Sequence, residues 1–204
     1  MIARLRRIVS DQLSRPSGRL GRVVAFGMNR GNRAFNARAI EKLDVRSGTR
    51  VLDLGFGGGL TFSPLLERGA TVVGVDRAGD MVAAAAGRHR ADVEAGRLSL
   101  HTGEVQALPL EDAAVDRVLT VNTVYFWPDL APGLRELHRV VTPGGSVVIG
   151  IRDGAVMERV DPAVFTVRTA QEVAAALTVA GFTGAEVDTA PDGATHLISA
   201  IRPG

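Results

Sequence analysis

The stretch Val51-Leu52-Asp53-Leu54-Gly55-Phe56-Gly57-Gly58-Gly59 decides the fold. Its first part is a run of apolar residues that only Asp53 interrupts, and four glycines follow within five residues. This pattern is typical of a buried parallel strand that turns through a tight loop into a helix, which we expect over residues 61–67. Glycine permits positive φ, and without a Cβ it lets a ligand lie against the backbone. The stretch therefore predicts either a ligand-binding loop or an ordinary glycine-rich turn, and Asp53 favours the first.

Length and composition bound the class of protein. The chain has 204 residues, 46% of them hydrophobic, which fits one globular domain of ordinary size. It contains no cysteine, so disulfides, thiolate metal sites and a cysteine nucleophile are excluded. No apolar run approaches the length of a membrane span, and Ile8-Val9 is too short for the core of a signal peptide. We therefore expect a cytoplasmic protein.

The charges are distributed unevenly along the chain. Residues 1–50 carry eleven arginines and Lys42 against three acidic residues, whereas the remainder carries twelve basic and nineteen acidic residues. A basic arm can bind an anionic partner such as nucleic acid or a lipid surface. It can equally fold back on its own acidic domain, and the composition leaves both alternatives open.

Predicted strands and helices alternate along the rest of the chain. We expect helices over residues 32–43, 61–67, 79–91, 129–141 and 169–180, the last with a Thr169/Glu172 capping box. We expect strands over residues 50–54, 71–76, 98–102, 115–121, 146–151, 185–188 and 196–201. The turn Pro191-Asp192-Gly193 joins the last two strands as a hairpin. This order predicts an α/β fold with a parallel sheet covered on both faces and an antiparallel last strand.

Polar side chains follow several of these strands at the point where each strand ends. They are Asp53, Asp76, Glu104 and Asn122. Ligands of open parallel sheets bind beyond the carboxyl ends of the strands, so we expect these residues around one site. Asp76 is placed to accept hydrogen bonds from ribose hydroxyls, and Glu104 from an adenine amino group. The sequence therefore predicts an adenosine-containing ligand.

Two other nucleotide sites are excluded by single residues. A dinucleotide-binding fingerprint needs a third glycine where this chain has Leu60. The only lysine, Lys42, precedes the glycine loop, so a phosphate-binding Gly-Lys-Ser/Thr loop cannot form.

Taken together, these motifs resemble a class I S-adenosylmethionine-dependent methyltransferase. The resemblance covers residues 45–151 and is carried by Asp53-x-Gly55-x-Gly57-x-Gly59, Asp76, Gly103-Glu104, Asn122 and the segment from Leu134 to Gly145. Residues 28–44 and 122–129 further resemble a subgroup of small actinobacterial-type methyltransferases, which includes sugar O-methyltransferases. The family implies a Rossmann-like sheet of order 3-2-1-4-5-7-6 with strand 7 antiparallel. It also implies an N-terminal helical arm or lid over residues 1–44 before a cofactor-binding domain over residues 45–204.

The resemblance implies a cofactor site for S-adenosyl-L-methionine. Asp76 would hold the ribose, Glu104 with Val105 the adenine, and Gly55, Gly57 and the Asn122 backbone the methionine moiety. The full implied set is Asp53, Gly55, Phe56, Gly57, Gly59, Asp76, Arg77, Met81, Gly103, Glu104, Val105 and Asn122. Phe56 is bulkier than the residue usual in the family, and Glu104 replaces the commoner aspartate. No metal ion is expected.

The acceptor of the methyl group is predicted by elimination to be a hydroxyl. Absence of cysteine excludes the thiolate-adduct route to pyrimidine carbon, and residues 122–125 lack the paired prolines of enzymes that methylate base amino groups. A hydroxyl needs a base or a strong acceptor, and Tyr125, Asp153 and His196 are the candidates at the same sheet edge. Each has a structural alternative: packing for Tyr125, a loop for Asp153 and a hairpin for His196. A phenol, a carboxylate and an imidazole suit a polyhydroxylated small molecule such as a sugar or glycoside.

Other partners stay open. An RNA-binding methyltransferase could use the basic arm, but the aromatic residues are too scattered for a base-stacking platform, so nucleic acid is not the expected partner. A membrane-docked, lipid-modifying methyltransferase could use the amphipathic segment over residues 2–13. A homodimer is also open. We further expect residues 29–35 to close over the cofactor as part of a lid.

Overall fold

The computed structural model describes residues 32–152 and 166–204. Several sequence predictions fall outside this part of the chain: the amphipathic segment over residues 2–13, the first residues of the expected lid, and Asp153. The helix expected over residues 32–43 is present over residues 32–42.

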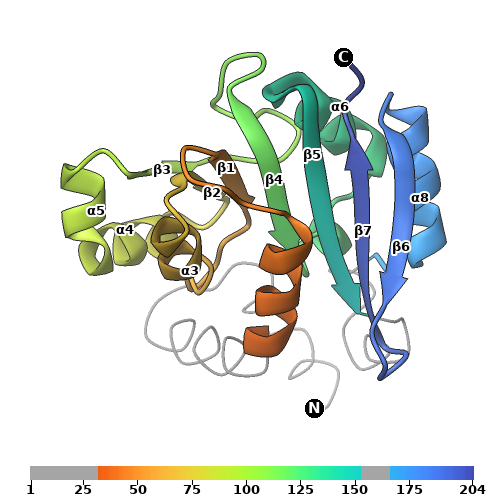
Figure 1. The fold of residues 1–204 in the computed structure, drawn as a ribbon, viewed down its shortest axis with the longest axis horizontal. Coiled ribbons are helices and arrows are strands. Elements are labelled where there is room, and N and C mark those ends of the chain that lie inside the picture. Colours follow the sequence, from red (N-terminus) through yellow and green to blue (C-terminus); the bar gives the residue numbers. More distant parts are fainter. Residues whose placement is uncertain (1–31, 153–165) are drawn as a thin grey trace, which may run out of the picture.

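A single seven-stranded sheet organises the molecule (Figure 1). Its order is β3-β2-β1-β4-β5-β7-β6, as predicted. The strands are β1 Arg50–Leu54, β2 Thr71–Asp76, β3 Leu98–Thr102, β4 Val115–Val121, β5 Val141–Arg152, β6 Thr183–Thr189 and β7 Thr195–Ile201. Strand β7 runs antiparallel to both β5 and β6, whereas the other pairs are parallel. The carboxyl ends of β1, β2, β3 and β4 therefore meet at one edge of the sheet.

Helices cover both faces of the sheet. They are α3 Phe62–Glu67, α4 Gly79–Arg88, α5 Arg90–Glu94, α6 Leu130–Val140 and α8 Ala170–Val179, with a short 3-10 helix η1 Val124–Phe126. In Figure 1, α6 and α8 lie behind the sheet and the helix over residues 32–42 lies in front. Successive strand residues point to opposite faces of the sheet. Val51 therefore packs in the core that contains Phe35 and Ile40 of the helix over residues 32–42, whereas Leu52 packs in the core that contains Leu134 of α6 and Val173 of α8.

The helix over residues 32–42 is fixed to the sheet by both apolar and charged contacts. Phe35, Ala39 and Ile40 are buried on one side of this helix. On its outer flank, Arg38 pairs with Asp188 of β6 at 2.6 Å between guanidinium and carboxylate. This segment therefore forms a wall of the structure along the same edge where the strands end.

Two elements differ from their predicted bounds. The helix expected over residues 79–91 is interrupted at His89, whose ring packs edge-on against Phe62 with ring centres 5.4 Å apart. Strand β5 begins at Val141 rather than Ser146 because the backbone continues through Gly145. A Cβ at Gly145 would lie 2.6 Å from the carbonyl oxygen of Asp116, so only glycine allows this close approach.

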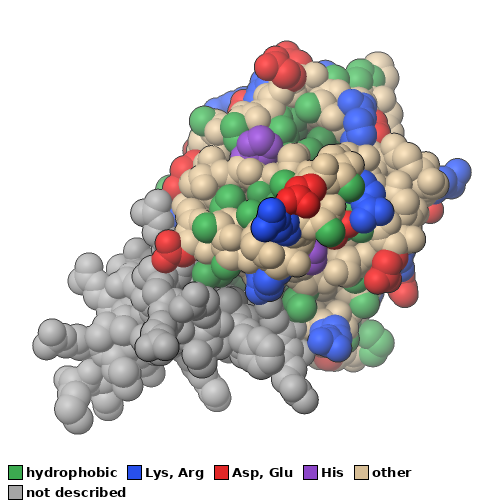
Figure 2. Space-filling view, turned by 90° about the vertical axis from the view of Figure 1, so that its left-hand side faces the viewer, with side chains coloured by type: hydrophobic (Ala, Val, Ile, Leu, Met, Phe, Trp, Pro, Cys, Tyr) green, Lys and Arg blue, Asp and Glu red, His purple; other side chains and the backbone are tan. Residues whose placement is uncertain are grey.

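The face that carries α4 and α5 shows acidic and basic side chains interspersed (Figure 2). One such pair is Arg90 and Glu94, 2.6 Å apart on α5. Mixed exposed pairs of this kind contribute little to stability, typically about 0–1 kcal/mol each.

Candidate functional site

The glycine loop after β1 takes a conformation that requires its glycines. Gly55, Gly57 and Gly59 have φ of 69°, 50° and 68°, in the left-handed region that disfavours residues with a Cβ. A Cβ at Gly55 would lie only 2.3 Å from Cγ2 of Thr123, which follows β4. The loop can therefore approach the β4 turn closely, and the two connections form one floor at the sheet edge.

Asp76 connects the end of β2 to the glycine loop. Its carboxylate accepts hydrogen bonds from the Gly57 N–H at 2.8 Å and from the Ala78 N–H at 2.9 Å. Burial raises the pKa of the Asp76 carboxyl, and these two backbone donors oppose that rise. Each carboxylate oxygen has a second lone pair, so Asp76 can still accept from a ligand.

Asp53 lies at the base of the same loop. It is 3% exposed and accepts a hydrogen bond from the hydroxyl of Thr61, the residue that begins α3. Loss of hydration on burial raises the pKa of Asp53 to about 7, and the nearby charge of Asp76 adds to this rise. The Thr61 hydroxyl opposes it. Asp53 thereby connects the strand end to the start of the helix and titrates in a range where its charge can change.

Arg77 and Glu104 form a pair across the site, with Nε and Oε1 3.6 Å apart. Glu104 follows β3, and the side chain beside it, Val105, is buried. Gly103 must be small because a Cβ there would lie 3.0 Å from Pro109 and 3.2 Å from Val75. The loop after β3 is thus held close to the end of β2.

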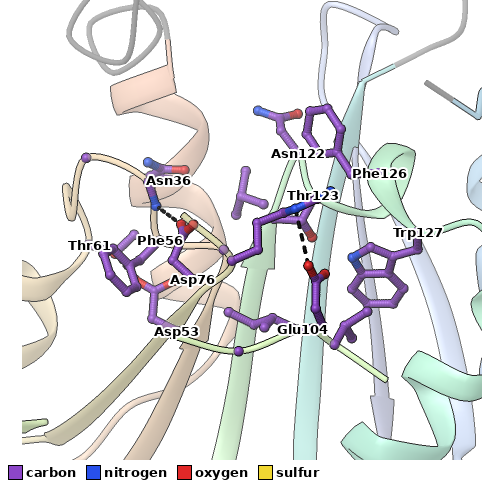
Figure 3. A pocket seen from close by; sticks show the side chains of 18 of the residues that line it. Asn36, Asp53, Phe56, Thr61, Asp76, Glu104, Asn122, Thr123, Phe126 and Trp127 are labelled. Carbon is purple, nitrogen blue, oxygen red and sulfur yellow. Dashed lines mark hydrogen bonds and ion pairs between the residues drawn. The ribbon is translucent and has the colours of Figure 1, made fainter. Parts of the chain in front are cut away.

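These groups open onto one pocket (Figure 3). Ten residues of the cofactor set predicted from the sequence line it: Asp53, Gly55, Phe56, Gly57, Asp76, Arg77, Gly103, Glu104, Val105 and Asn122. Gly59 and Met81 do not; Gly59 closes the loop through its N–H to the Phe56 carbonyl at 2.8 Å, and Met81 is buried. The structure therefore places these ten residues around one pocket. Their contacts with a cofactor remain predictions.

Two chemically different groups of side chains line the pocket. We call Asp53, Asp76, Arg77 and Glu104 the charged half of the lining. We call the uncharged group the neutral half; it consists of Asn32, Asn36, Asn122, Thr123, Phe126 and Trp127. The neutral side chains come from the helix over residues 32–42 and from residues 122–127, which run from the end of β4 through η1.

Asn122 is unusual within the neutral half. It has φ of 59°, and its N–H donates to the Gly150 carbonyl at 2.8 Å. Its side-chain Oδ1 is buried and has no hydrogen-bond partner among the residues that the structure describes. A buried acceptor without a partner is costly, which marks this atom as a candidate ligand contact.

The three residues predicted as bases are not brought together in the pocket. Tyr125 is 2% exposed, and its phenol donates to the Arg152 carbonyl at 3.0 Å and accepts from the Arg152 N–H. His196 lies on β7, where its Nδ1 is 3.0 Å from the hydroxyl of Thr189 on β6. Neither lines the pocket, and Asp153 is outside the described residues. These contacts favour a structural role for Tyr125 and His196, and their catalytic role stays a prediction.

Ten residues that line the pocket were not in the predicted cofactor set, although Asn32 was part of the predicted lid; they are Asn32, Asn36, Leu54, Gly58, Thr61, Gln106, Val121, Thr123, Phe126 and Trp127. Asn32 and Asn36 stand one helical turn apart, and this spacing places both on one face of the helix. The spacing was a usable signal, because the two carboxamides flank the buried Phe35 on a helix whose other residues are apolar or charged.

Two kinds of feature are absent from residues 32–152 and 166–204. No helix in these ranges is long and apolar enough to cross a membrane. Within the same ranges, no group of three or more His, Asp or Glu side chains is arranged to hold a metal ion.

Comparison with known proteins identifies the core of the chain. Residues 52–149 match the family described as Methyltransferase domain. The chain is 30% identical over 133 residues to the ubiquinone/menaquinone biosynthesis C-methyltransferase UbiE of Geotalea daltonii, covering 64% of this chain and 55% of that protein. The chain thus spans about half the length of this curated relative.

Solved structures show the same fold. The methyltransferase of Haloferax volcanii in complex with the Trm112 methyltransferase activator superposes with a TM-score of 0.76 at 23% identity, covering 88% of this chain and 94% of that chain. Phosphoethanolamine N-methyltransferase 2 of Haemonchus contortus, solved with S-adenosyl-L-methionine, superposes with a TM-score of 0.73 at 17% identity, covering 84% and 53%.

Proposed function

Since this chain belongs to the class I S-adenosylmethionine-dependent methyltransferases, we propose that it transfers a methyl group from S-adenosyl-L-methionine to a hydroxyl of a small molecule. The observation that carries the proposal is the pocket itself. It joins a glycine loop with left-handed φ angles to carboxylates from the end of β2 and from the loop after β3, and the neutral half completes the same lining.

The residues present fit the cofactor. Asp76 keeps free lone pairs for ribose hydroxyls, and Glu104 offers a carboxylate for an adenine amino group. At Gly57, nothing in the described part of the chain lies within 4 Å of where a Cβ would be, so the backbone is open to a ligand. Phe56, which is bulkier than the residue usual in the family, is buried against Phe62 with ring centres 4.9 Å apart. This packing accommodates the larger side chain.

When bound, the cofactor supplies an electrophilic methyl group on a sulfonium. The work left to this chain is alignment and exclusion of water, because a displacement that disperses charge gains most from orientation. Phe126 and Trp127 present apolar surface in the neutral half, and Asn36 and Asn122 present carboxamides that can orient an acceptor. A base for the departing hydroxyl proton would come from Tyr125, His196 or Asp153, as the sequence predicts.

The acceptor class has two candidates. A sugar or glycoside fits the several carboxamides of the neutral half, because each can donate and accept hydrogen bonds. A carbon on a hydroxylated ring is the second candidate. The Geotalea relative is a ubiquinone/menaquinone biosynthesis C-methyltransferase, and the two aromatic side chains Phe126 and Trp127 in the pocket favour a flat acceptor.

Partners beyond the acceptor are further proposals. The Haloferax neighbour is a complex with an activator protein, so an activator subunit is one partner to test for this chain. The division into an arm over residues 1–44 and a domain from residue 45, the lid over residues 29–35 and a homodimer also stay proposals. The alternative partners RNA and a lipid membrane would be bound by the basic residues before residue 32, which lie outside the described residues.

One experiment tests the proposed function directly. Trp127 is the sole tryptophan of the chain and lines the pocket, so its fluorescence should change on titration with S-adenosylhomocysteine. Mixtures of hydroxylated small molecules are then incubated with S-adenosyl-L-methionine, and mass spectrometry locates the added methyl on oxygen or carbon. Methylation on oxygen supports the first candidate, and methylation on carbon the second. An unchanged fluorescence signal together with no binding by calorimetry would reject cofactor binding.

A further inference from the structure

The Asn122 side chain carries a buried hydrogen-bond acceptor. Its Oδ1 is buried and lacks a hydrogen-bond partner within the described residues. A carboxamide oxygen can only accept, so the missing partner must carry an O–H or N–H group. Leaving such an acceptor unpaired destabilises the protein, and a ligand that supplies a donor removes that cost.

The backbone keeps this side chain in place. Asn122 has φ of 59°, a conformation that asparagine tolerates better than most residues, and its N–H is held by the Gly150 carbonyl at 2.8 Å. On its other side, Thr123 is packed against Gly55 and its hydroxyl lies 2.5 Å from that of Thr120. The carboxamide therefore projects from a fixed turn rather than from a free loop.

The surroundings indicate which kind of donor fits. In Figure 3 the Asn122 carboxamide and the Phe126 ring are seen at the same end of the view, away from Asp53 and Glu104, and both residues line the pocket. Asn36 faces the same pocket from the helix over residues 32–42. A cationic donor would be better held by the carboxylates of the charged half, whereas a neutral donor suits an uncharged carboxamide next to an aromatic ring.

We propose that Asn122 selects the methyl acceptor by accepting a hydrogen bond from a neutral hydroxyl on a ring that lies against Phe126. The inference rests on the proposed function and deepens it by naming the acceptor class as a neutral hydroxylated ring. An analogue that lacks the donor leaves Oδ1 unpaired and binds more weakly. Asn122 is thus a specificity residue, and Phe126 supplies the surface that places the ring.

The test compares pairs of small molecules that differ only in the donor. Binding of phenol and of anisole is measured by ligand-observed NMR, with and without S-adenosylhomocysteine. Cyclohexanol and methoxycyclohexane form a second pair that distinguishes an aromatic from a saturated ring. We expect the hydroxyl compound of at least one pair to bind about tenfold more tightly than its methyl ether, the ratio that corresponds to about 1.4 kcal/mol. Equal binding within both pairs, or no binding of either hydroxyl compound, overturns the proposal.

Two variants assign the preference to this residue. Asn122→Gly removes the carboxamide at a position whose positive φ suits glycine, so the fold should be retained, which circular dichroism and thermal unfolding check. It should abolish the preference for the hydroxyl compound. Asn122→Asp keeps an acceptor of the same shape and should preserve that preference.

The cofactor affinity of the same variants shows whether the group that donates to Oδ1 belongs to the methyl acceptor or to the cofactor. If Asn122→Gly lowers the affinity for S-adenosylhomocysteine tenfold and leaves the preference for the hydroxyl compound unchanged, the partner of Oδ1 is the cofactor's amino group and the proposal is wrong. If wild-type protein does not bind S-adenosylhomocysteine at all, the proposed function fails. The hydroxyl preference measured without it still decides the role of Asn122.

Discussion

The charged and neutral halves of the pocket differ in how far their polar groups are already satisfied. In the charged half, Asp76 is held by two backbone N–H groups and Asp53 by the Thr61 hydroxyl. In the neutral half, Oδ1 of Asn122 is buried without a partner in the described structure. Each half thus keeps one buried atom without a hydrogen-bond partner in the described part of the chain, Nε of Arg77 and Oδ1 of Asn122, but Arg77 lies 3.6 Å from the opposite charge of Glu104, whereas Asn122 is uncharged. This contrast fits a constant cofactor on one side and a selected acceptor on the other.

The two halves touch at Gly55, and a substitution there should have the largest effect. Gly55→Ala places a Cβ 2.3 Å from Cγ2 of Thr123 at φ of 69°. A left-handed residue costs about 1–2 kcal/mol and overpacking about 1–3 kcal/mol, so we expect the free energy of unfolding to fall by about 2–4 kcal/mol. Urea denaturation measures this fall.

A matched glycine separates the two causes. Gly57→Ala has φ of 50° but meets no atom of the described residues within 4 Å, so it should lose only about 1–2 kcal/mol. Adding Thr123→Ser to Gly55→Ala removes the clashing methyl and should recover part of the loss. Equal losses in Gly55→Ala and Gly57→Ala, with no recovery, would show that the contact between the halves is unimportant.

Asp76→Ala should break the charged half alone. The substitution removes the acceptor proposed for the ribose hydroxyls and frees the Gly57 N–H, so affinity for S-adenosylhomocysteine should fall by about 1–3 kcal/mol, roughly 5- to 150-fold. Calorimetry measures the fall, and Asp76→Asn, which keeps one acceptor oxygen, should lose less. Phenol binding measured without the cofactor should be unchanged. Unchanged cofactor affinity would remove Asp76 from the cofactor site.

The charge of Asp53 should make stability depend on pH. Its carboxyl has a pKa of about 7 in the folded protein against 3.8 in the reference state, so folding favours the protonated form. The stabilisation is complete below about pH 4 and is lost as the pH rises through about 7. Between about pH 6 and about pH 8 the free energy of unfolding should therefore fall by about 1 kcal/mol. Urea denaturation at both values checks this, and Asp53→Asn should flatten the dependence. A stability that rises over this range in wild type alone would contradict the assignment.

The smallest effect is expected beneath the neutral half, at Tyr125. Tyr125→Phe removes the hydroxyl that bonds the backbone of Arg152, which should lower the free energy of unfolding by about 0.5–1.5 kcal/mol. If the phenol is structural, kcat should be retained once an acceptor is known. A fall in kcat at unchanged stability would instead identify Tyr125 as the base predicted from the sequence.

The sheet and the charged half could be predicted because their signals are local. Asp53 is the second-last residue of β1, Asp76 ends β2 and Glu104 comes two residues after β3, so the parallel arrangement alone brings these three carboxylates to one edge. The glycine pattern is equally local, since the positive φ angles at Gly55, Gly57 and Gly59 follow from a tight turn. The sequence spacing was therefore sufficient to predict the charged half of the pocket.

The neutral half could not be predicted in the same way because it depends on tertiary packing. Asn32 and Asn36 reach the pocket only because Phe35 and Ile40 fix their helix against the sheet. Tyr125 and Phe126 are adjacent in the sequence, yet η1 buries the first and turns the second toward the pocket. No periodicity separates these two aromatic residues, and the choice is made by the hydrogen bonds to Arg152.

The helix over residues 32–42 has a consequence for how such a protein can diversify. One side of it is bound to the sheet through Phe35, Ala39 and Ile40 and, on the flank, through Arg38, while Asn32 and Asn36 face the pocket. Asn32 also accepts a hydrogen bond from Arg152 at 2.7 Å, so Asn36 is the position where a substitution can change the proposed acceptor surface while the helix and the glycine loop stay in place. New acceptors can therefore arise by drift at an exchangeable position, while the rest of the chain keeps a single shared methyl donor.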